Sequence, residues 1–421
     1  MEMTQYKSLI SAQHPSHWKV VRNKTFLSVT GEVVGKRANE FVLLSLTTNG
    51  VVVRDIESGK GKFPKDFDTY QVVKPNELVF CLFDIDETPR TVGLVETEGM
   101  LTGAYTALKV NQNRAFPQFV YYYLAVDNIK GLKPYYSGLR KTVRADKFLQ
   151  IYIPLPPLAE QEKIVSYLED KTSKIDAFVA DKEKEIELLQ ELKQKTIADA
   201  VTKGLNPDAK MKDYSSLISS LCPEHWKIVR NKSFLSLTGE KVGKKASEYV
   251  LLSLTTKGVI VRDIESGKGK FPKDFDTYQI VKPNVLVFCL FDIDETPRTV
   301  GLVETEGMLT GAYTAFKVHT ELANPEYIYN YYLCVDNVKA LKPYYSGLRK
   351  TVRADKFQQI YMPLPPLDEQ QAIVAYIEEK CEMIDKLASE LQSEIDYLKE
   401  YKQRLIADCV TGQVNVQNET I

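Results

Sequence analysis

The sequence predicts an α+β protein built as a tandem repeat, in which a mixed, β-rich domain is followed by a long helix, twice over. Three observations lead to this fold class. A segment of the first half returns in the second half, short β-type runs fill the first part of each half, and a long heptad-patterned segment fills the second part. A chain of 421 residues has room for such a repeat, since a domain commonly holds about 150 residues.

The repeat can be read directly from the residues. HPSHWKVVRNKTFLSVTGE at 14–32 returns as CPEHWKIVRNKSFLSLTGE at 222–240. Segments 43–107 and 251–315 differ only at the position pairs 49/257, 52/260, 72/280 and 77/285, whereas the helical segments have diverged much further. Either the central segments were copied over one another or both do the same job. Both interpretations imply that the two β domains share a specificity.

Turn signals divide each β-rich part into short strands. FVLLSL, GVVVRDI, YQVV, LVFCLF, TVGLVET and YTALKV alternate with TTNG, ESGKGK, KPNE and ETPR. A helix is expected at 117–132, with Pro117 near its first position. The resulting division is a β-rich domain at 1–153, a central helical spacer at 154–211, a second β-rich domain at 212–362 and a C-terminal helical spacer at 363–421.

Each spacer is predicted to hold one helix of about 45 residues and about 65 Å, running in the first half from about Ala159 to Thr202 without proline or glycine. Leu192 and Leu387 accompany the heptad seam. The residues expected to pack helix on helix are Ile175, Val179, Ile186, Leu189, Ile384, Leu391, Leu398 and Leu405. We expect an antiparallel coiled coil with pseudo-two-fold symmetry. The alternative is that each helix folds back on its own β domain, although the helix is longer than a domain diameter of about 25–30 Å.

The net charge of −1 conceals a regional split. The β-rich segments 1–150 and 212–359 carry +5 and +4, and the helical segments 151–211 and 360–421 carry −3 and −7. The composition, 44% hydrophobic and 26% charged, excludes a disordered chain, a collagen-like chain and a disulfide scaffold. Basic domains on acidic helices favour a nucleic-acid partner for the domains.

Two basic clusters recur in both domains. RDIESGKGKFPK at 54–65 places lysines on a glycine-rich loop, and KPYYSGLRKTVRADK at 133–147 pairs tyrosines with cations. Cations on flexible side chains suit phosphates, and arginine suits base edges. The candidate DNA-binding residues are Arg54, Lys60, Lys62, Arg90, Tyr135, Arg140, Lys141, Arg144, Arg262, Lys268, Lys270, Arg298, Tyr344, Arg349, Lys350 and Arg353. The alternative is that these clusters are solvated surface loops.

No catalytic motif is visible in the sequence. A phosphate-binding GxxxxGK[ST] loop, a GxGxxG turn, a GxSxG elbow and an aminomethyltransferase [DNS]PP[YFW] motif are all missing. One alternative enzyme class stays open, a stand-alone Mg²⁺-dependent endonuclease using Asp84, Asp86 and Glu87 of FDIDETPR and their repeat. We favour a turn or an arginine-pairing role for that cluster. His17 and His225 are expected to be packing residues rather than bases.

The sequence also gives expectations about the cellular compartment and about metal binding. Neither a signal peptide nor a run of about 20 apolar residues is present, so we expect a cytoplasmic protein without a membrane partner. The six cysteines are widely spaced and the four histidines are scattered, which favours reduced thiols and no metal site.

The ordered set of motifs resembles the specificity subunit of Type I restriction-modification enzymes. It comprises P-x-H-W-K opening each half, PLPPLxEQ at 154–161 and 363–370 leading into each helix, and TKGLNPDAKMKDYSS at 202–216 joining the halves. The set occurs twice at matching spacing and the resemblance spans essentially the whole chain. The family implies that each β-rich domain is a target-recognition domain that reads one half of a split site in double-stranded DNA.

The resemblance also implies partners and cofactors. The helices would separate the half-sites and dock two methyltransferase subunits, which carry S-adenosylmethionine. Restriction subunits that use ATP and Mg²⁺ would join through the methyltransferase, and this chain would perform no chemistry and hold no cofactor. The family's two recognition domains normally differ, but here they are nearly the same in sequence. We therefore expect a bipartite, palindromic target, and a gap that shortens when four residues are deleted from both helices.

Overall fold

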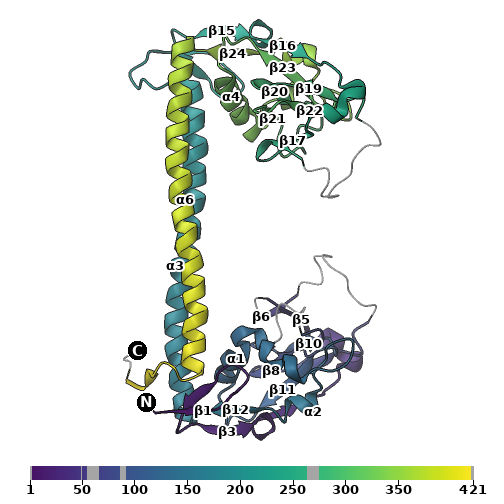
Figure 1. Ribbon diagram of the computed structural model, residues 1–421, viewed down its shortest axis with the longest axis vertical. Coiled ribbons are helices and arrows are strands. Elements are labelled where there is room, and N and C mark those ends of the chain that lie inside the picture. The colour runs from purple at the N-terminus through teal and green to yellow at the C-terminus, as the bar shows by residue number, and fades with distance from the viewer. Residues whose placement is uncertain (1, 49, 55–65, 86–91, 263–274, 419–421) are drawn as a thin grey trace. The chain divides into compact units, whose positions relative to one another are not determined.

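The computed structural model describes residues 2–48, 50–54, 66–85, 92–262 and 275–418, and it divides into two compact units (Figure 1). Unit 1 comprises Met1–Glu183 and Ser393–Ile421, and unit 2 comprises Lys184–Gln392. Each unit therefore contains one β-rich domain together with parts of both long helices.

Two four-stranded sheets form the first β-rich domain. One has the order β4-β11-β8-β9 and the other the order β6-β5-β10-β7, with β5 and β10 parallel and the other neighbours antiparallel. The pairs β1-β2 and β12-β3 complete the domain. The strands are β1 (Met3–Gln5), β2 (Gln13–Pro15), β3 (Lys19–Arg22), β4 (Leu27–Val29), β5 (Val42–Thr47), β6 (Gly50–Val53), β7 (Gln71–Val73), β8 (Glu77–Phe80), β9 (Val92–Leu94), β10 (Gly99–Leu101), β11 (Thr106–Val110) and β12 (Tyr152–Leu155).

The second β-rich domain repeats this topology. Its main sheet has the order β16-β23-β20-β21, and the pairs β17-β18 and β19-β22 are joined by a parallel bridge between Leu251 and Met308. The strands are β13 (Met211–Asp213), β14 (Leu221–Pro223), β15 (Lys227–Arg230), β16 (Leu235–Thr238), β17 (Leu252–Thr255), β18 (Gly258–Val261), β19 (Gln279–Val281), β20 (Val285–Phe288), β21 (Val300–Leu302), β22 (Gly307–Leu309), β23 (Thr314–Val318) and β24 (Tyr361–Leu364).

Several short helices accompany the strands in each domain. The helix predicted at 117–132 is α1 (Pro117–Ala125), which begins with proline and continues as a 3-10 helix, η3 (Val126–Tyr135). Its counterpart α4 (Pro325–Asn337) is capped by the Asn324 side chain, which accepts backbone hydrogen bonds from residues 326 and 327. The remaining short α-helices are α2 (Ala145–Phe148) and α5 (Ala354–Phe357). The short 3-10 helices are η1 (Asn23–Thr25), η2 (Gly35–Glu40), η4 (Asn231–Ser233), η5 (Gly243–Glu248), η6 (Lys342–Tyr344) and η7 (Val416–Asn418).

The long helices are α3 (Leu158–Lys203), one residue longer at each end than the predicted Ala159–Thr202, and α6 (Leu367–Val410), which lies within the predicted C-terminal spacer at 363–421. They pack against each other in antiparallel sense. In unit 1, Asp176 pairs with Lys402 at 2.6 Å while Glu183, later in α3, pairs with Lys399, earlier in α6, at 3.0 Å. In unit 2, Lys193 pairs with Asp385 at 2.6 Å. The predicted fold class, two β-rich domains each followed by a long helix that packs on the other, is therefore confirmed.

The helix ends also take part in the domain cores. In unit 2, Ile197 and Val201 near the end of α3 and Ile373 near the start of α6 join the core around Trp226, which is 1% exposed. In unit 1, Gly412 packs so closely on Pro15 and Trp18 that a Cβ atom at this position would overlap the proline ring. Each β domain is therefore held by the start of its own helix and by the end of the other.

The motifs that open each half and each helix meet in one contact. In unit 1, Glu160 of PLPPLAEQ accepts hydrogen bonds from His17 at 2.8 Å and from the Trp18 indole at 3.1 Å. Glu369 makes the same two contacts with His225 and Trp226. Trp18 is buried, but the His17 side chain is 48% exposed, so the histidine is a surface partner of the glutamate rather than a packed residue.

Among the described residues, no helix is long and apolar enough to cross a membrane.

Candidate nucleic-acid interface

The basic segment at 133–147 contains a short β-hairpin, which we call the basic hairpin (residues 137–142, and 346–351 in the second half). Ser137 and Thr142 exchange two backbone hydrogen bonds of 3.0 and 3.2 Å, and the N–H of Lys141 closes the turn on the carbonyl of residue 138 at 3.1 Å. Lys141 has a φ of 41°, in the left-handed region that side chains with a Cβ rarely adopt. The second half repeats these bonds and this φ, so both turns have a fixed, strained shape.

The hairpin is attached to the segment that follows strand β8. The N–H of Asp84 donates to the carbonyl of Arg140 and the N–H of Val143 donates to the carbonyl of Leu82, both at 2.8 Å. The second half makes the same two bonds at the same distance. The two clusters are far apart in the sequence, and the structure brings Asp84 next to Arg140 and Asp292 next to Arg349.

Arginine is held at this junction in a defined orientation. The Arg140 guanidinium lies 3.7 Å from the Asp84 carboxylate and 5.2 Å from the centre of the Phe83 ring, which stacks on Tyr105. The second half repeats the arrangement around Arg349, with 3.9 Å to its carboxylate and 5.5 Å to its ring. Both arginine side chains are about three-quarters exposed. A stacked and paired guanidinium with open N–H groups is preorganised for a phosphate or a base edge.

The acidic residues of the second copy pair with the basic ones. Asp294 lies 3.0 Å from Lys350 and 3.3 Å from Lys342, and Glu295 lies 3.4 Å from Lys350. The hydrogen bond from Lys350 lowers the pKa of Asp294, and in return raises the pKa of Lys350. In the described part of the chain, no three His, Cys, Asp or Glu residues are grouped to hold a metal ion. These contacts favour the pairing role for the acidic cluster; Asp86 and Glu87 lie outside the described residues.

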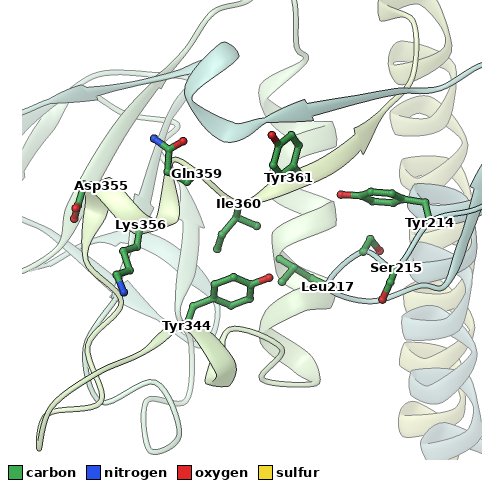
Figure 2. Close-up of a pocket in the computed structure, with 10 residues that line it drawn as sticks. Tyr214, Ser215, Leu217, Tyr344, Asp355, Lys356, Gln359, Ile360 and Tyr361 are labelled. Atoms are coloured by element: carbon green, nitrogen blue, oxygen red, sulfur yellow. The ribbon is translucent and has the colours of Figure 1, made fainter.

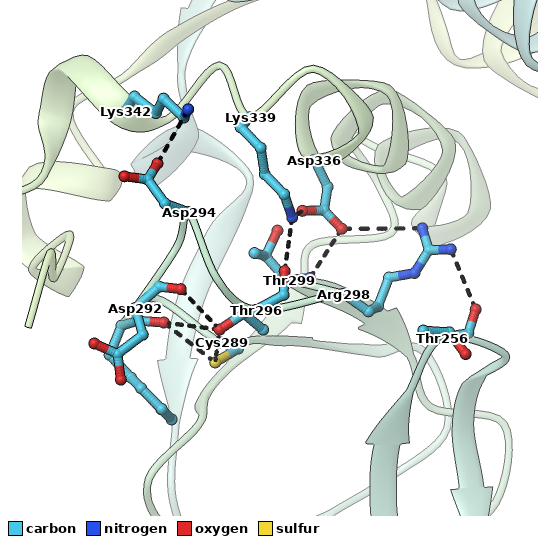
Figure 3. Close-up of polar contacts among 11 residues, drawn as sticks. Thr256, Cys289, Asp292, Asp294, Thr296, Arg298, Thr299, Asp336, Lys339 and Lys342 are labelled. Atoms are coloured by element: carbon cyan, nitrogen blue, oxygen red, sulfur yellow. Dashed lines mark hydrogen bonds and ion pairs between the residues drawn. The ribbon is translucent and has the colours of Figure 1, made fainter. Parts of the chain in front are cut away.

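Arg298, one of the candidate DNA contacts, points inward (Figure 3). Its guanidinium lies 4.0 Å from the carboxylate of Asp336, which is 2% exposed, and donates to the carbonyl of Thr256 at 3.2 Å. Asp336 also pairs with Lys339 at 2.6 Å and accepts the backbone N–H of Thr299 at 2.9 Å. These contacts give Arg298 a role in fixing the strand-end loops, and leave its guanidinium little surface for DNA. Its first-copy counterpart, Arg90, lies outside the described residues.

The candidate tyrosines Tyr135 and Tyr344 line equivalent cavities, of 450 Å³ in unit 1 and 610 Å³ in unit 2. Figure 2 shows Tyr344, Tyr361 and Tyr214 around the unit 2 cavity, with Lys356 at its edge. Arg230 stacks over the Tyr361 ring at 4.9 Å. The tyrosines therefore lie at a cavity wall and not on the basic hairpin itself.

The remaining candidates are divided between exposed and undescribed positions. Arg144 and Arg353 are about 70% exposed and pair with acidic neighbours two residues later at 3.0 Å. Arg54 and Arg262 follow strands β6 and β18 and are half-buried. Five candidates lie outside the described residues: Lys60, Lys62, Arg90, Lys268 and Lys270.

The long helices have two chemically different edges beside their seam. All eight predicted packing residues are buried or half-buried in the structure. If Ile175 and Ile384 take heptad position d, the ion pairs Asp176–Lys402, Glu183–Lys399 and Lys193–Asp385 each include a residue at position e. Lys182, in contrast, pairs with Glu394 at position g on the opposite edge. The opposite edge, positions c and g, carries exposed apolar side chains, and we call it the apolar edge. Its members are Phe178, Tyr397 and Tyr401 in unit 1 and Leu188, Leu192, Met383 and Leu387 in unit 2.

Sequence reasoning missed some residues at these sites. Leu192 and Leu387, predicted to accompany the seam, are 50% and 45% exposed on the apolar edge. Leu139 and Leu348, at the tips of the two basic hairpins, are 104% and 103% exposed and were not singled out. The glycine before each leucine was the available signal, because serine-glycine pairs mark exposed turns.

Comparison with known proteins gives a consistent result. The sequence model of the family described as Type I restriction modification DNA specificity domain matches residues 98–188 and 223–397. The putative type I restriction enzyme MjaX specificity subunit of Methanocaldococcus jannaschii is 23% identical over 98% of this chain and 97% of its own length. The type I restriction enzyme EcoBI specificity subunit of Escherichia coli is 22% identical over 63% of this chain and 59% of its own length.

Solved structures share the fold. A chain from work on complex assembly and conformational transition of the type I R-M system superposes with a TM-score of 0.65 at 15% identity, covering 95% of this chain and 99% of that one. The HsdS subunit from Thermoanaerobacter tengcongensis superposes with a TM-score of 0.53 at 16% identity, covering 95% and 98%.

Proposed function

Because this chain belongs to the Type I restriction-modification DNA specificity family, and is thus a non-catalytic specificity subunit, we propose that each β domain reads one half of a bipartite duplex target. The observation that carries the proposal is the basic hairpin with its oriented arginine. Arg140 and Arg349 each combine an aromatic stack, a carboxylate partner and an exposed guanidinium, in domains of net charge +5 and +4. Phosphate contacts from the surrounding cations would supply affinity, and the arginines would contribute base discrimination.

The two half-sites should be the same sequence in inverted order. The domains differ at only four position pairs between 43–107 and 251–315, and the hairpin segments 133–148 and 342–357 are identical. The two domains are attached to antiparallel helices through the same glutamate, histidine and tryptophan contacts. Two domains with nearly the same sequence suit two copies of one half-site, and we expect these copies in inverted order with the helices setting the gap.

The apolar edge of the helices is the proposed docking surface for two methyltransferase subunits. Phe178 and Tyr401 are 60% and 56% exposed in unit 1, and Leu188 and Leu192 are 54% and 50% exposed in unit 2. Since Phe178 and Leu387 occupy equivalent repeat positions, as do Leu188 and Tyr397, each unit offers a similar apolar surface. Exposed apolar positions beside a seam suit a further helix packed on the pair.

The partner subunits would carry out the chemistry. S-adenosylmethionine would be held by the methyltransferase subunits, and ATP with Mg²⁺ by restriction subunits that join through them. A reader of chromosomal DNA with such partners would work in the cytoplasm.

Sequencing DNA methylated by the reconstituted complex tests the proposal. We expect modified bases in two inverted copies of one short sequence around a nonspecific gap, and two unrelated half-sequences would contradict the palindrome. Purified chain incubated alone with plasmid and Mg²⁺ should leave the DNA intact. Cleavage that is lost when Asp84, Asp86, Asp292 and Asp294 are all replaced by asparagine would instead support the endonuclease alternative.

A further inference from the structure

The two most exposed apolar side chains of the described residues occupy equivalent positions. Leu139 and Leu348 are 104% and 103% exposed, each at the tip of a basic hairpin. A fully exposed leucine contributes nothing to packing, so the fold gives no reason for it. The sixteen residues of 133–148 nevertheless return unchanged at 342–357, although the helices just before them, α1 and α4, have diverged.

The hairpin presents this leucine on a rigid support. Its ends are closed by paired backbone bonds, and Gly138 and Lys141 have φ values of 76° and 41°. Arg140, the next residue, is tied to the body of the domain by its carbonyl, its carboxylate partner and the Phe83 ring. A strained turn held by three separate contacts positions its tip with little loss of entropy on binding.

The neighbours of the leucine indicate what it meets. Arg140 and Lys141 follow it directly and Arg144, 71% exposed, lies a few residues further on. An apolar tip flanked by cations suits duplex DNA, where the cations meet phosphates and the apolar group leaves water against the bases. Proteins that distort DNA insert leucine, isoleucine, methionine or phenylalanine between base pairs in this manner.

We propose that Leu139 and Leu348 are wedge residues, each entering one base step of its half-site and unstacking it. The inference rests on the proposed DNA-reading function and adds to it a distortion step. Sequence preference at that step would then arise from the ease of unstacking as well as from hydrogen bonds.

The test uses the complex with its methyltransferase subunits and the target that methylation sequencing defines. 2-Aminopurine is placed at each position of a half-site in turn, and its fluorescence reports unstacking. We expect a fluorescence rise at one step in each half-site, away from the methylated base. In the double variant Leu139→Ala with Leu348→Ala this rise should vanish, and affinity for the target should fall by about 100-fold, since each leucine would bury most of its apolar surface. Affinity for nonspecific duplex should stay within about twofold.

Two matched variants sharpen the result. Leu139→Met with Leu348→Met keeps an apolar wedge and should retain the fluorescence rise and most of the affinity. Val29→Ala with Leu237→Ala removes equivalent side chains that are 54% exposed on β4 and β16, and should change neither. All three variants should unfold at the temperature of the parent.

Three outcomes would overturn the wedge. One is specific binding with no unstacking at any step away from the methylated base. Another is unstacking that persists in the double alanine variant. The third is a loss of affinity without unstacking that thymine-to-uracil replacement reproduces, which would make the leucine a contact for a thymine methyl group. Failure of the proposed function would look different, because the parent complex would then bind its supposed target no better than nonspecific DNA.

Discussion

Replacing Gln161 by alanine should destabilise unit 1 by about 3 kcal/mol, although the side chain touches no proposed DNA contact. Gln161 is fully buried where PLPPLAEQ enters α3. Its side chain accepts the backbone N–H of Phe116 at 2.8 Å and donates to the carbonyls of Pro156 at 2.8 Å and Arg114 at 3.4 Å. Truncation leaves the N–H of Phe116 and the carbonyl of Pro156 buried without a partner, and each such loss costs about 1–3 kcal/mol.

The chain provides a local reporter for this experiment. Its two tryptophans lie one in each unit, and Trp18 donates to Glu160, the residue beside Gln161. In a Trp226→Phe background, Trp18 fluorescence follows the urea unfolding of unit 1. With a slope of about 2–3 kcal/mol per molar urea, a loss of about 3 kcal/mol lowers the midpoint by about 1 M.

The matched control is Gln112→Ala, the same substitution at an exposed loop position of unit 1. Its midpoint should stay within about 0.2 M of the parent, because surface substitutions without partners change stability by less than about 0.5 kcal/mol. A midpoint for Gln161→Ala within about 0.2 M of the parent would contradict the stabilising role of the Gln161 hydrogen bonds. A midpoint shift in Gln112→Ala as large as that in Gln161→Ala would contradict it as well.

Three further predictions concern the spacer, the docking surface and the thiols. Deleting one heptad from each helix, residues 181–187 and 390–396, keeps the seam in register and removes about 10 Å of helix. Methylation sequencing should then find unchanged half-sites with a gap about 3 base pairs shorter, and an unchanged gap would contradict the proposal that the helices set the gap. Leu188→Asp with Tyr397→Asp should abolish copurification of the methyltransferase subunits, whereas Glu191→Ala with Glu400→Ala, on the outer faces of the same helices, should leave copurification unchanged. Copurification that persists in the Leu188→Asp, Tyr397→Asp variant would exclude the apolar edge as the docking surface. Burial raises the pKa of Cys334 and of Cys409 to about 12, so at pH 8 both thiols are neutral and should resist alkylation in the native protein. Peptide mass spectrometry should show that half-buried Cys381 is alkylated first, and early alkylation of Cys334 would contradict this prediction.

The large elements were predictable because their signals are periodic. The absence of proline and glycine predicted α3, and the heptad spacing of Ile384, Leu391, Leu398 and Leu405 predicted the seam of α6. The repeat then predicted the second half from the first. The strand order was not accessible from the sequence, because short strands of similar composition do not show which neighbour they pair with.

The details of the interface were only partly predictable. Asp84 and Arg140 are more than fifty residues apart in sequence, and only the fold brings them together. Arg298 looked like an exposed cation after a turn, yet Asp336, from α4, draws it inward. The serine-glycine pair before Leu139 marks an exposed turn, but only the structure shows that the leucine side chain itself is fully exposed.

The central claim is that this chain reads two inverted copies of one half-site, and competition binding of the reconstituted complex tests it most directly. Two duplexes carry the same two half-sites at the same gap, one as an inverted and the other as a direct repeat. The inverted repeat should bind at least about 100-fold more tightly, because a direct repeat leaves one domain on mismatched base pairs that cost about 1–3 kcal/mol each. Equal affinity for the two duplexes, or tighter binding of the direct repeat, would contradict a symmetric reader.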